Sequence, residues 1–189
     1  MNSFYTLEEL KERGFKSLGK KVYISKKCSI YGAENISIGN NVRVDDFCIL
    51  SGKISIGNYV HISAYSSLYG KGGISIGNFC GISPRSTIYS SSDDFSGEFM
   101  ISPMVPPELT NVKEGNVILK DYCQLGANTI VMPCVTIGEG TVTGAFSLVL
   151  KDLKEWAIYF GIPSKIYKKR EKRLVKLSQA LIKDKTLLE

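Results

Sequence analysis

The chain has 189 residues, 43% of them apolar and 22% charged, which is typical of one soluble globular domain. No run approaches the ~20 apolar residues of a membrane-spanning helix, and the partly acidic start is unlike a secretory signal, so we expect a cytoplasmic protein. The net charge is +6, but residues 164–189 carry nine Lys or Arg and three Asp or Glu, so the first 163 residues are neutral. Such uneven charge argues against a nucleic-acid-binding protein.

Residues 1–17 are expected to form a short helical cap. Thr6 and Glu9 have the spacing of a capping box, in which each side chain binds the backbone amide of the other residue. The run LEELKERGF that follows has a helical composition. A helix at this point would cover the exposed first turn of the structure that follows, as terminal caps do in repeat proteins.

Residues 18–162 are built on a period of six residues. Leu, Ile or Val fills seventeen of eighteen positions of this frame, which are Leu18, Ile24, Ile30, Ile38, Val44, Leu50, Ile56, Ile62, Leu68, Ile76, Ile82, Ile88, Leu119, Leu125, Val131, Ile137, Thr143 and Val149. A helix would repeat its apolar face every 3.6 residues. A period of six with Gly, Asn and Asp at the turns predicts an all-β protein, a parallel β-helix of about six coils.

The cysteines are interpreted as core residues. Four of the five (Cys28, Cys48, Cys80 and Cys123) fall on a second, smaller inward position, four residues after the first. The chain has no CxxC pair and a single histidine, so we predict no metal site. An odd number of cysteines without a secretion signal favours reduced thiols.

Two segments depart from the repeat. Residues 90–116 form a long loop between two coils, and a loop of this length in a solenoid is usually functional or disordered. Its apolar residues Phe95, Phe99, Met100 and Met104 predict an ordered excursion with apolar contacts of its own. Residues 163–189 are predicted to form a basic amphipathic helix, with apolar residues at Ile166, Leu174, Leu177, Leu181 and Leu188.

The segments IGNFCGISPRSTIYSSSDD, LGANTIVMPCV and TGAFSLVLKDL carry a close resemblance to the hexapeptide-repeat acyltransferases, over roughly residues 18–168. The chain resembles in particular sugar O-acetyltransferases of the galactoside and maltose acetyltransferase type, and surface-polysaccharide acetyltransferases. The resemblance implies a left-handed β-helix, a homotrimer with active sites between subunits, and acetyl-CoA as the acyl donor.

The resemblance also suggests catalytic residues. In the sugar acetyltransferases the external loop brings in a catalytic histidine, and Asp93 stands at that position here. His61 aligns beside the acceptor-binding position one coil earlier, and an imidazole suits proton removal from a hydroxyl at neutral pH. We predict that His61 is the general base and meets Asp93 and Asp94 of a neighbouring subunit, which would stabilise the imidazolium. The acceptor-binding residues implied are Ser63, Tyr65 and Ser92.

The donor-binding residues are implied by the later coils. Small residues at Ala127, Gly144 and Ala145 match positions where the pantetheine arm of CoA passes close to the backbone, and Lys151, Lys165 and Lys168 match positions near the CoA phosphates. Family members often have arginine at the position of Lys165. For the rest of the basic tail three roles stay open: CoA contact, peripheral contact with anionic membrane lipid, and a solvated helix face.

The expected function is acetyl-CoA-dependent transfer of an acetyl group to the hydroxyl of a sugar or nucleotide sugar, in surface-polysaccharide biosynthesis. The alternative is an N-acetyltransferase of a nucleotide-linked amino sugar, because a neutral amine attacks with little help from a base. A non-catalytic β-helix scaffold is a more distant alternative, and the long loop and the donor-like coils argue against it.

Overall fold

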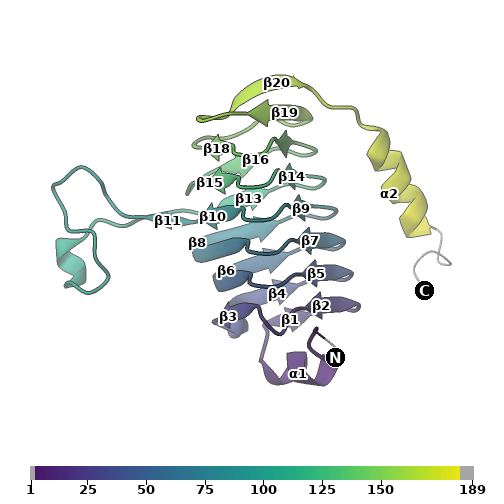
Figure 1. The fold of residues 1–189 in the computed structure, drawn as a ribbon, viewed down its shortest axis with the longest axis horizontal. Helices are drawn as coiled ribbons and strands as arrows, with labels where there is room; N and C mark the ends of the chain where they lie inside the picture. The colour runs from purple at the N-terminus through teal and green to yellow at the C-terminus, as the bar shows by residue number, and fades with distance from the viewer. Residues whose placement is uncertain (1–2, 184–189) are drawn as a thin grey trace.

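The computed structural model describes residues 3–183 and shows the predicted left-handed parallel β-helix, with a helix at each end and one long side loop (Figure 1). One face is a sheet of eight strands, β2 (Val22–Ile24), β5 (Val42–Val44), β7 (Val60–Ile62), β9 (Gly81–Ile82), β14 (Gln124–Leu125), β17 (Val142–Thr143), β19 (Ala157–Phe160) and β20 (Lys165–Lys169). Successive turns of the solenoid pair in parallel along this face, and only the last pair, β19 with β20, is antiparallel within it.

The other two faces form one ten-stranded sheet, because β6 and β8 continue around a corner of the solenoid. Its strands are β1 (Ser17–Leu18), β3 (Ser29–Tyr31), β4 (Ile36–Ile38), β6 (Ile49–Ile56), β8 (Ser67–Ile76), β10 (Thr87–Tyr89), β13 (Val117–Leu119), β15 (Ile130–Val131), β16 (Thr136–Ile137) and β18 (Leu148–Val149). A short 3-10 helix, η1 (Ala33–Asn35), precedes β4.

The six-residue frame fills the interior of the solenoid, as predicted. Every residue of the frame is buried except Leu18 and Ile30, which are partly buried and pack against the first turns of the core. Thr143, the one polar residue of the frame, is also buried, and its hydroxyl lies 3.0 Å from the hydroxyl of Thr129. The period of six therefore identifies the inward side of nearly every turn.

The cysteines at the second inward position are core residues, also as predicted. All four are buried. Burial raises the pKa of the Cys28 thiol to about 12 and that of Cys48 to about 11, so both are uncharged at neutral pH. Hydrogen bonding to Cys123 and burial raise the pKa of Cys80 as well. These thiols fill volume in the core and are poor nucleophiles.

The corners of the solenoid require a left-handed backbone conformation. Many of the residues that adopt it are not glycine. Twelve non-glycine residues among those described have φ between 50° and 64°. This conformation costs a residue with a β-carbon roughly 1–2 kcal/mol. Stacking from turn to turn compensates: Tyr59 and Phe79 stack with their centroids 4.7 Å apart, and Phe79 and Tyr122 with theirs 5.4 Å apart.

The N-terminal cap forms as expected. Helix α1 (Leu7–Glu12) begins with the predicted capping box, in which the Thr6 hydroxyl accepts from the Glu9 amide at 3.2 Å. The Glu9 carboxylate accepts from the Thr6 amide at 2.7 Å. Leu10 of this helix is buried against the first turn, so α1 covers the open end of the core.

The C-terminal end differs from the sequence-based expectation in two ways. The six predicted coils are followed by β19, which adds a seventh parallel strand to the eight-stranded sheet. The frame would place Glu155 inward there, and Leu153, Ala157 and Tyr159 fill the interior instead, so the repeat gave no signal for this turn. In addition, residues 165–169 form strand β20 and not the start of a helix. β20 pairs with β19 and covers a sheet edge that would otherwise stay exposed.

The expected C-terminal helix starts later, as α2 (Arg173–Lys183), and it lies back along the solenoid (Figure 1). The Ser178 hydroxyl lies 2.8 Å from the Tyr122 hydroxyl. The Arg170 guanidinium, just before α2, donates to the carbonyls of Tyr122 and Gly140, both at 2.8 Å. Leu188 lies outside the described residues, and within residues 3–183 no helix has the length and hydropathy to cross a membrane.

The side loop projects away from the solenoid (Figure 1). Its base is a two-stranded antiparallel ribbon of β11 (Ser91–Ser92) and β12 (Lys113–Glu114), and a 3-10 turn, η2 (Pro107–Leu109), lies in its outer part. The loop does not bury the apolar residues from which an ordered excursion was expected: Phe95, Phe99, Met100 and Met104 are all exposed. The reason is geometric, since a thin ribbon that leaves the solenoid has no core of its own to bury them.

Candidate functional site

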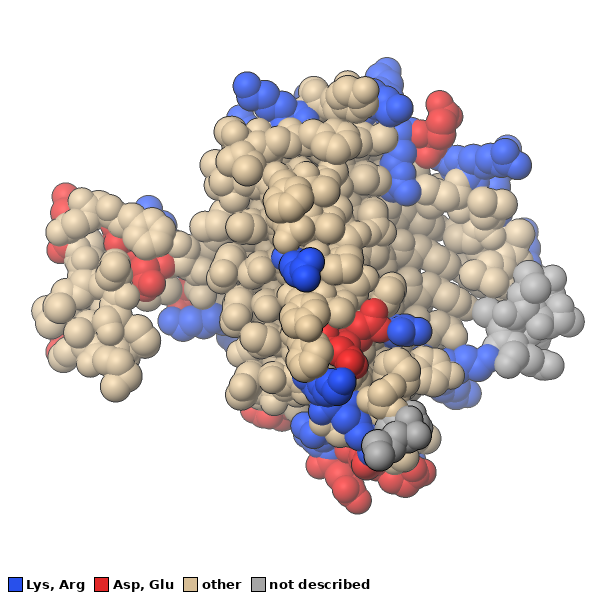
Figure 2. Space-filling model, in the orientation of Figure 1, with Lys and Arg blue, Asp and Glu red and all other residues tan. Residues whose placement is uncertain are grey.

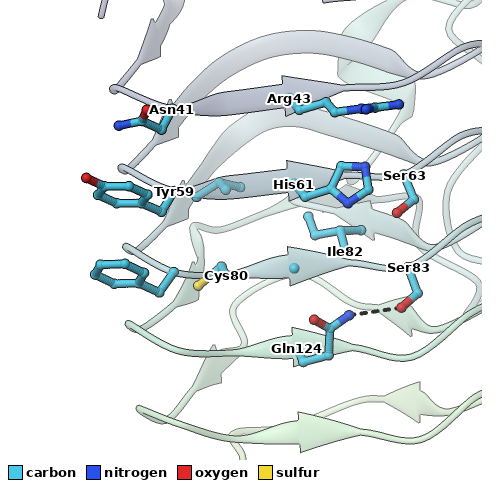
Figure 3. A pocket seen from close by; sticks show the side chains of 12 residues that line it. Asn41, Arg43, Tyr59, His61, Ser63, Cys80, Ile82, Ser83 and Gln124 are labelled. Carbon is cyan, nitrogen blue, oxygen red and sulfur yellow. Dashed lines mark hydrogen bonds between the residues drawn. The ribbon is translucent and has the colours of Figure 1, made fainter. Parts of the chain in front are cut away.

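A cavity of about 570 Å³ lies on the eight-stranded face (Figure 3). Residues at equivalent outward positions of four successive strands form its floor, and the strand register aligns them as Arg43, His61, Gly81 and Gln124. Because Gly81 has no side chain, a notch separates His61 from Gln124. Ser63 and Ser83 line one side of the cavity, where their strands end.

His61 is oriented by a carboxylate of its own chain. Its Nε2 lies 2.7 Å from Asp45 Oδ2, and Arg43 Nε donates to Asp45 Oδ1 at 2.6 Å. Partial burial alone would raise the pKa of Asp45, but the hydrogen bonds and charges of Arg43 and His61 lower it overall. A carboxylate only accepts hydrogen bonds, so neutral His61 carries its hydrogen on Nε2 and keeps Nδ1 as an acceptor. This tautomer suits a general base.

The partners predicted for His61 lie elsewhere in the chain. Asp93 and Asp94 are at the base of the side loop, and Asp93 lines a second cavity of about 410 Å³. Among the residues that the structure describes, the two cavities have no lining residue in common. Within one chain, the carboxylate beside His61 is that of Asp45. The predicted contact of His61 with Asp93 and Asp94 is one between subunits, and it stays a prediction.

Asp93 and Asp94 differ in their surroundings. Asp94 is buried, and its two carboxylate oxygens accept from the Ser96 amide and the Asn111 side chain, both at 2.7 Å. Hydrogen bonding to Ser96, together with that to Asn111, lowers the pKa of Asp94. Asp94 therefore anchors the loop, whereas Asp93 is partly exposed at the second cavity.

The three predicted acceptor-binding residues are not brought together in one chain. Ser63 lines the first cavity with His61, and Ser92 lines the second cavity with Asp93. Tyr65 is exposed at the next corner, stacked on Phe47 with a centroid distance of 4.9 Å.

Several residues that line the first cavity were not identified from the sequence, and Ser83 and Gln124 are two of them. Gln124 Nε2 donates to Ser83 Oγ at 2.9 Å (Figure 3). The six-residue frame contains a signal for Gln124, which stands between inward Cys123 and Leu125 just as His61 stands between Val60 and Ile62. Such a polar side chain must point outward, into the same column as His61.

The predicted donor-binding residues lie towards the C-terminal end of the solenoid. At Gly144 a β-carbon would lie 1.8 Å from the Phe160 ring, so this glycine lets the Phe160 ring pack against the backbone. Lys165 and Lys168 are exposed on β20, and Figure 2 shows Lys and Arg gathered around this end and along α2. Positive charge of this kind suits a phosphate-bearing ligand. Within residues 3–183 no group of three His, Cys, Asp or Glu is arranged to hold a metal ion.

Comparisons with known proteins identify the family to which the chain is similar. Residues 116–151 match the family model described as bacterial transferase hexapeptide (six repeats). A dTDP-4-amino-4,6-dideoxy-D-glucose acyltransferase of Escherichia coli is 46% identical over 172 residues, covering 89% of this chain and 90% of the relative. The chain belongs to the hexapeptide-repeat acyltransferase family. This family membership confirms the predicted fold and the predicted acyltransferase activity.

Two further relatives of this acyltransferase are informative. A crystal structure of a serine-to-cysteine mutant of AntD, an N-acyltransferase from Bacillus cereus, in complex with dTDP-4-amino-4,6-dideoxyglucose and coenzyme A, superposes with a TM-score of 0.95. It is 51% identical and covers 97% of this chain and 98% of that one. A putative lipopolysaccharide biosynthesis O-acetyl transferase of Escherichia coli K12 is 31% identical over 160 residues, 78% of this chain and 75% of the relative. The predicted acyl-CoA donor and sugar acceptor agree with these proteins.

Proposed function

We propose that this protein transfers an acyl group from acyl-CoA to the amino group of a nucleotide-linked 4-amino-4,6-dideoxy sugar. The observation that carries the proposal is the similarity, along nearly the whole chain, to two enzymes named for that acceptor or crystallised with it. The proposal therefore adopts the alternative from the sequence analysis, an amino-sugar acceptor, over the sugar hydroxyl that was the main expectation. The acyl group need not be acetyl, since AntD was also crystallised with 3-hydroxybutyryl-CoA.

Acyl transfer to an amine needs little help from a base. The lone pair of the neutral amine attacks the thioester carbon, the carbon–sulfur bond breaks, and CoA leaves as a thiolate. The nitrogen loses one proton and the thiolate takes up one proton, because a thiol is mostly protonated at neutral pH. The products are an amide and CoA. The protein's task is to hold the amine against the thioester and to stabilise the charge that develops on the carbonyl oxygen.

Ser83 and Asp93 are proposed to contact the reacting groups. The crystallised forms of AntD include variants of one serine and of one aspartate ten positions further on. In this chain Ser83 and Asp93 are likewise ten positions apart. Of the two loop carboxylates, Asp93 is the one not used to anchor the loop, which supports a role for it in the site and a structural role for Asp94.

The complete site is proposed to form between subunits of a homotrimer. Ser83 and His61 line one cavity and Asp93 lines another, so one chain does not bring them together. The exposed apolar side chains of the loop, such as Phe95 and Met104, support a contact with a neighbouring copy, because large exposed apolar surfaces mark interaction sites. The loop would then carry Asp93 and Ser92 to the Ser83 cavity of the next subunit.

O-acetylation is the second candidate, and a specific observation favours it. The Asp45–His61 pair has the arrangement in which a carboxylate orients an imidazole for proton removal from a hydroxyl. The relative that is named as a putative O-acetyl transferase also favours a hydroxyl acceptor. For an amine acceptor, His61 would instead accept a hydrogen bond from the bound sugar through Nδ1.

The donor is proposed to bind at the C-terminal end, with Ala127, Gly144 and Ala145 beside the pantetheine arm and Lys151, Lys165 and Lys168 near the phosphates. Binding there would direct the thioester towards the notch between His61 and Gln124.

The test uses purified protein with acetyl-CoA or 3-hydroxybutyryl-CoA and follows free CoA. One acceptor is dTDP-4-amino-4,6-dideoxyglucose, and the other is the matching sugar with a hydroxyl at C4. We expect CoA release with the amino sugar, largely retained in His61→Ala. Release only with the hydroxyl sugar, abolished in His61→Ala, would establish O-acetylation instead.

A further inference from the structure

We propose that Gln124 is a positioning residue that makes Ser83 a hydrogen-bond donor towards the reacting thioester. The inference rests on the proposed acyl transfer and adds a residue and a hydrogen-bond direction to it. Three features of the cavity support it: the orientation of the Gln124 amide, the space at Gly81, and the surroundings of the Ser83 hydroxyl.

The orientation of the Gln124 amide is fixed by two neighbours. Its Nε2 lies 2.9 Å from Ser83 Oγ and 3.0 Å from the backbone carbonyl oxygen of Leu125. A carbonyl oxygen only accepts hydrogen bonds, so it must face the NH2 group and not the amide oxygen. The amide therefore presents a donor, and not an acceptor, to Ser83.

Gly81 leaves the space in which this amide lies. A β-carbon at position 81 would stand 2.1 Å from Gln124 Oε1 and 2.9 Å from its Cδ. In the column of outward residues, Gly81 lies between His61 and Gln124. The missing side chain thus does two things: it opens the notch, and it lets Gln124 fold over the turn before it to reach Ser83.

The consequence for Ser83 follows from proton counting. Its oxygen accepts from Gln124, so its single hydrogen remains to be donated elsewhere. Ser83 lines the cavity, so that hydrogen is directed at whatever occupies it. Gln124 cannot remove a proton, and a nucleophilic role for Ser83 would require a base. As a hydrogen-bond donor, the Ser83 hydroxyl needs no group other than Gln124.

A donor at this place would act on the carbonyl oxygen of the thioester. That oxygen gains negative charge as the acceptor nitrogen adds to the carbon, and a donor held in advance stabilises the charge. Ser83 is the residue that touches the reactants, and Gln124 acts through it by holding the hydroxyl and by donating to one of its two lone pairs.

The test is a double-mutant cycle on the full-length protein, measured with whichever acceptor the wild-type protein uses. Ser83→Ala is expected to lower kcat about 100-fold, as for removal of one such donor. Gln124→Met keeps the length of the side chain and removes the amide, and we expect a roughly tenfold loss of kcat with little change in KM. In the Ser83→Ala background the same change should have almost no effect.

Two further variants sharpen the test. Gln124→Glu places a carboxylate that accepts the Ser83 hydrogen and turns it away from the cavity, so we expect a larger loss than in Gln124→Met. Gln179→Met, on the exposed side of α2, is the matched control and should keep wild-type kcat. Thermal unfolding of every variant separates loss of the site from loss of the fold.

The outcomes are distinct. The proposal is overturned if Gln124→Met keeps full kcat, if it costs as much in the Ser83→Ala background as in the wild type, or if Gln124→Glu is the more active variant. The choice of acceptor is decided separately, by the wild-type protein alone, so an error about the amine does not affect the cycle.

Discussion

The solenoid buries its apolar side chains, whereas the side loop of residues 90–116 exposes several of them. In the solenoid each turn buries its inward residues against the turns above and below it. In the loop Phe95 is 79% exposed and Met104 is 90% exposed. The solenoid therefore buries apolar surface through its own repeats, whereas the loop leaves apolar surface exposed, which supports the proposed contact with a neighbouring subunit. The site proposed above needs both parts, a rigid face for Ser83 and a projecting arm for Asp93.

The largest effect on stability should come from the solenoid. Leu50 is fully buried, and Leu50→Ala should lower the free energy of unfolding by about 2–5 kcal/mol, through lost burial and a cavity. Phe95→Ala in the loop is the counterpart and should change it by less than about 0.5 kcal/mol in the dissociated chain. Denaturant unfolding measures both, and gel filtration should show weaker assembly for Phe95→Ala. Equal destabilisation by the two changes would refute the contrast.

Gly81→Ala, on the solenoid face, should lower activity without lowering stability. The new methyl group meets only the tip of the Gln124 side chain, which can move aside. We expect roughly tenfold slower transfer, about 1.4 kcal/mol in the barrier, with a thermal midpoint close to that of the wild type. Steady-state rates and calorimetry make the comparison. A fully active Gly81→Ala protein would show that Gln124 has no role in the site.

The Asp45 cluster gives the solenoid face a dependence on pH. The folded protein lowers the pKa of Asp45, so this group stabilises the fold above the pKa of the unfolded chain, near ~3.9. That contribution is lost as the pH falls through the lower, folded-state pKa. Asp45→Asn should therefore lower stability by up to about 1 kcal/mol at pH 7, and the difference should shrink towards pH 3. Thermal melts at both values test it; a constant difference would contradict it.

Asp94→Ala should loosen the loop and leave the solenoid intact. Both carboxylate oxygens of Asp94 hold the loop backbone and Asn111, so their loss should speed proteolysis between residues 95 and 110. The thermal midpoint of the solenoid should not change. Glu98→Ala, an exposed residue of the same loop, is the control. Equal cleavage of the two variants would show that Asp94 is no anchor.

The smallest predicted effect concerns the C-terminal end of the solenoid, where the acyl-CoA donor is proposed to bind. Lys168→Ala removes one exposed charge from β20 and should raise KM for acyl-CoA roughly two- to fivefold, or about 0.5–1 kcal/mol. The KM for the sugar should stay constant. Lys176→Ala on α2 is the control and should change neither constant. If both lysines matter equally, the effect is general electrostatic attraction and not a phosphate contact.

The fold could be predicted from the sequence to the extent that its contacts are local and periodic. The frame that runs through Leu50 and Ile56 fixes which side chains face inward, and it does so turn after turn. β19 and β20 were not predicted because they break the frame. Tyr159 stands where the preceding turns have Thr143 and Leu125, but it does not follow from them at the six-residue spacing. Pairing of β20 with β19 overrides the helical composition of residues 165–169.

The site was harder to predict because it depends on positions in neighbouring turns. His61 stood out as the single imidazole, yet its partner Asp45 lies 16 residues earlier, one turn below. Ser83 and Gln124 are 41 residues apart, since the side loop intervenes between their turns. Only the stacked turns show that these residues meet. The contribution of Asp93 from another subunit was expected from the family resemblance and not from any local pattern of residues.

The central claim, acyl transfer to an amine, is tested most directly by competition. The protein is incubated with acetyl-CoA and equal amounts of dTDP-4-amino-4,6-dideoxyglucose and dTDP-6-deoxyglucose, which differ only in the group at C4, and products are read by mass spectrometry. The account predicts that the acetyl group appears on the amino sugar as a base-stable amide. Acetyl groups found on the hydroxyl sugar, as a base-labile ester, with the amino sugar unchanged, would contradict it.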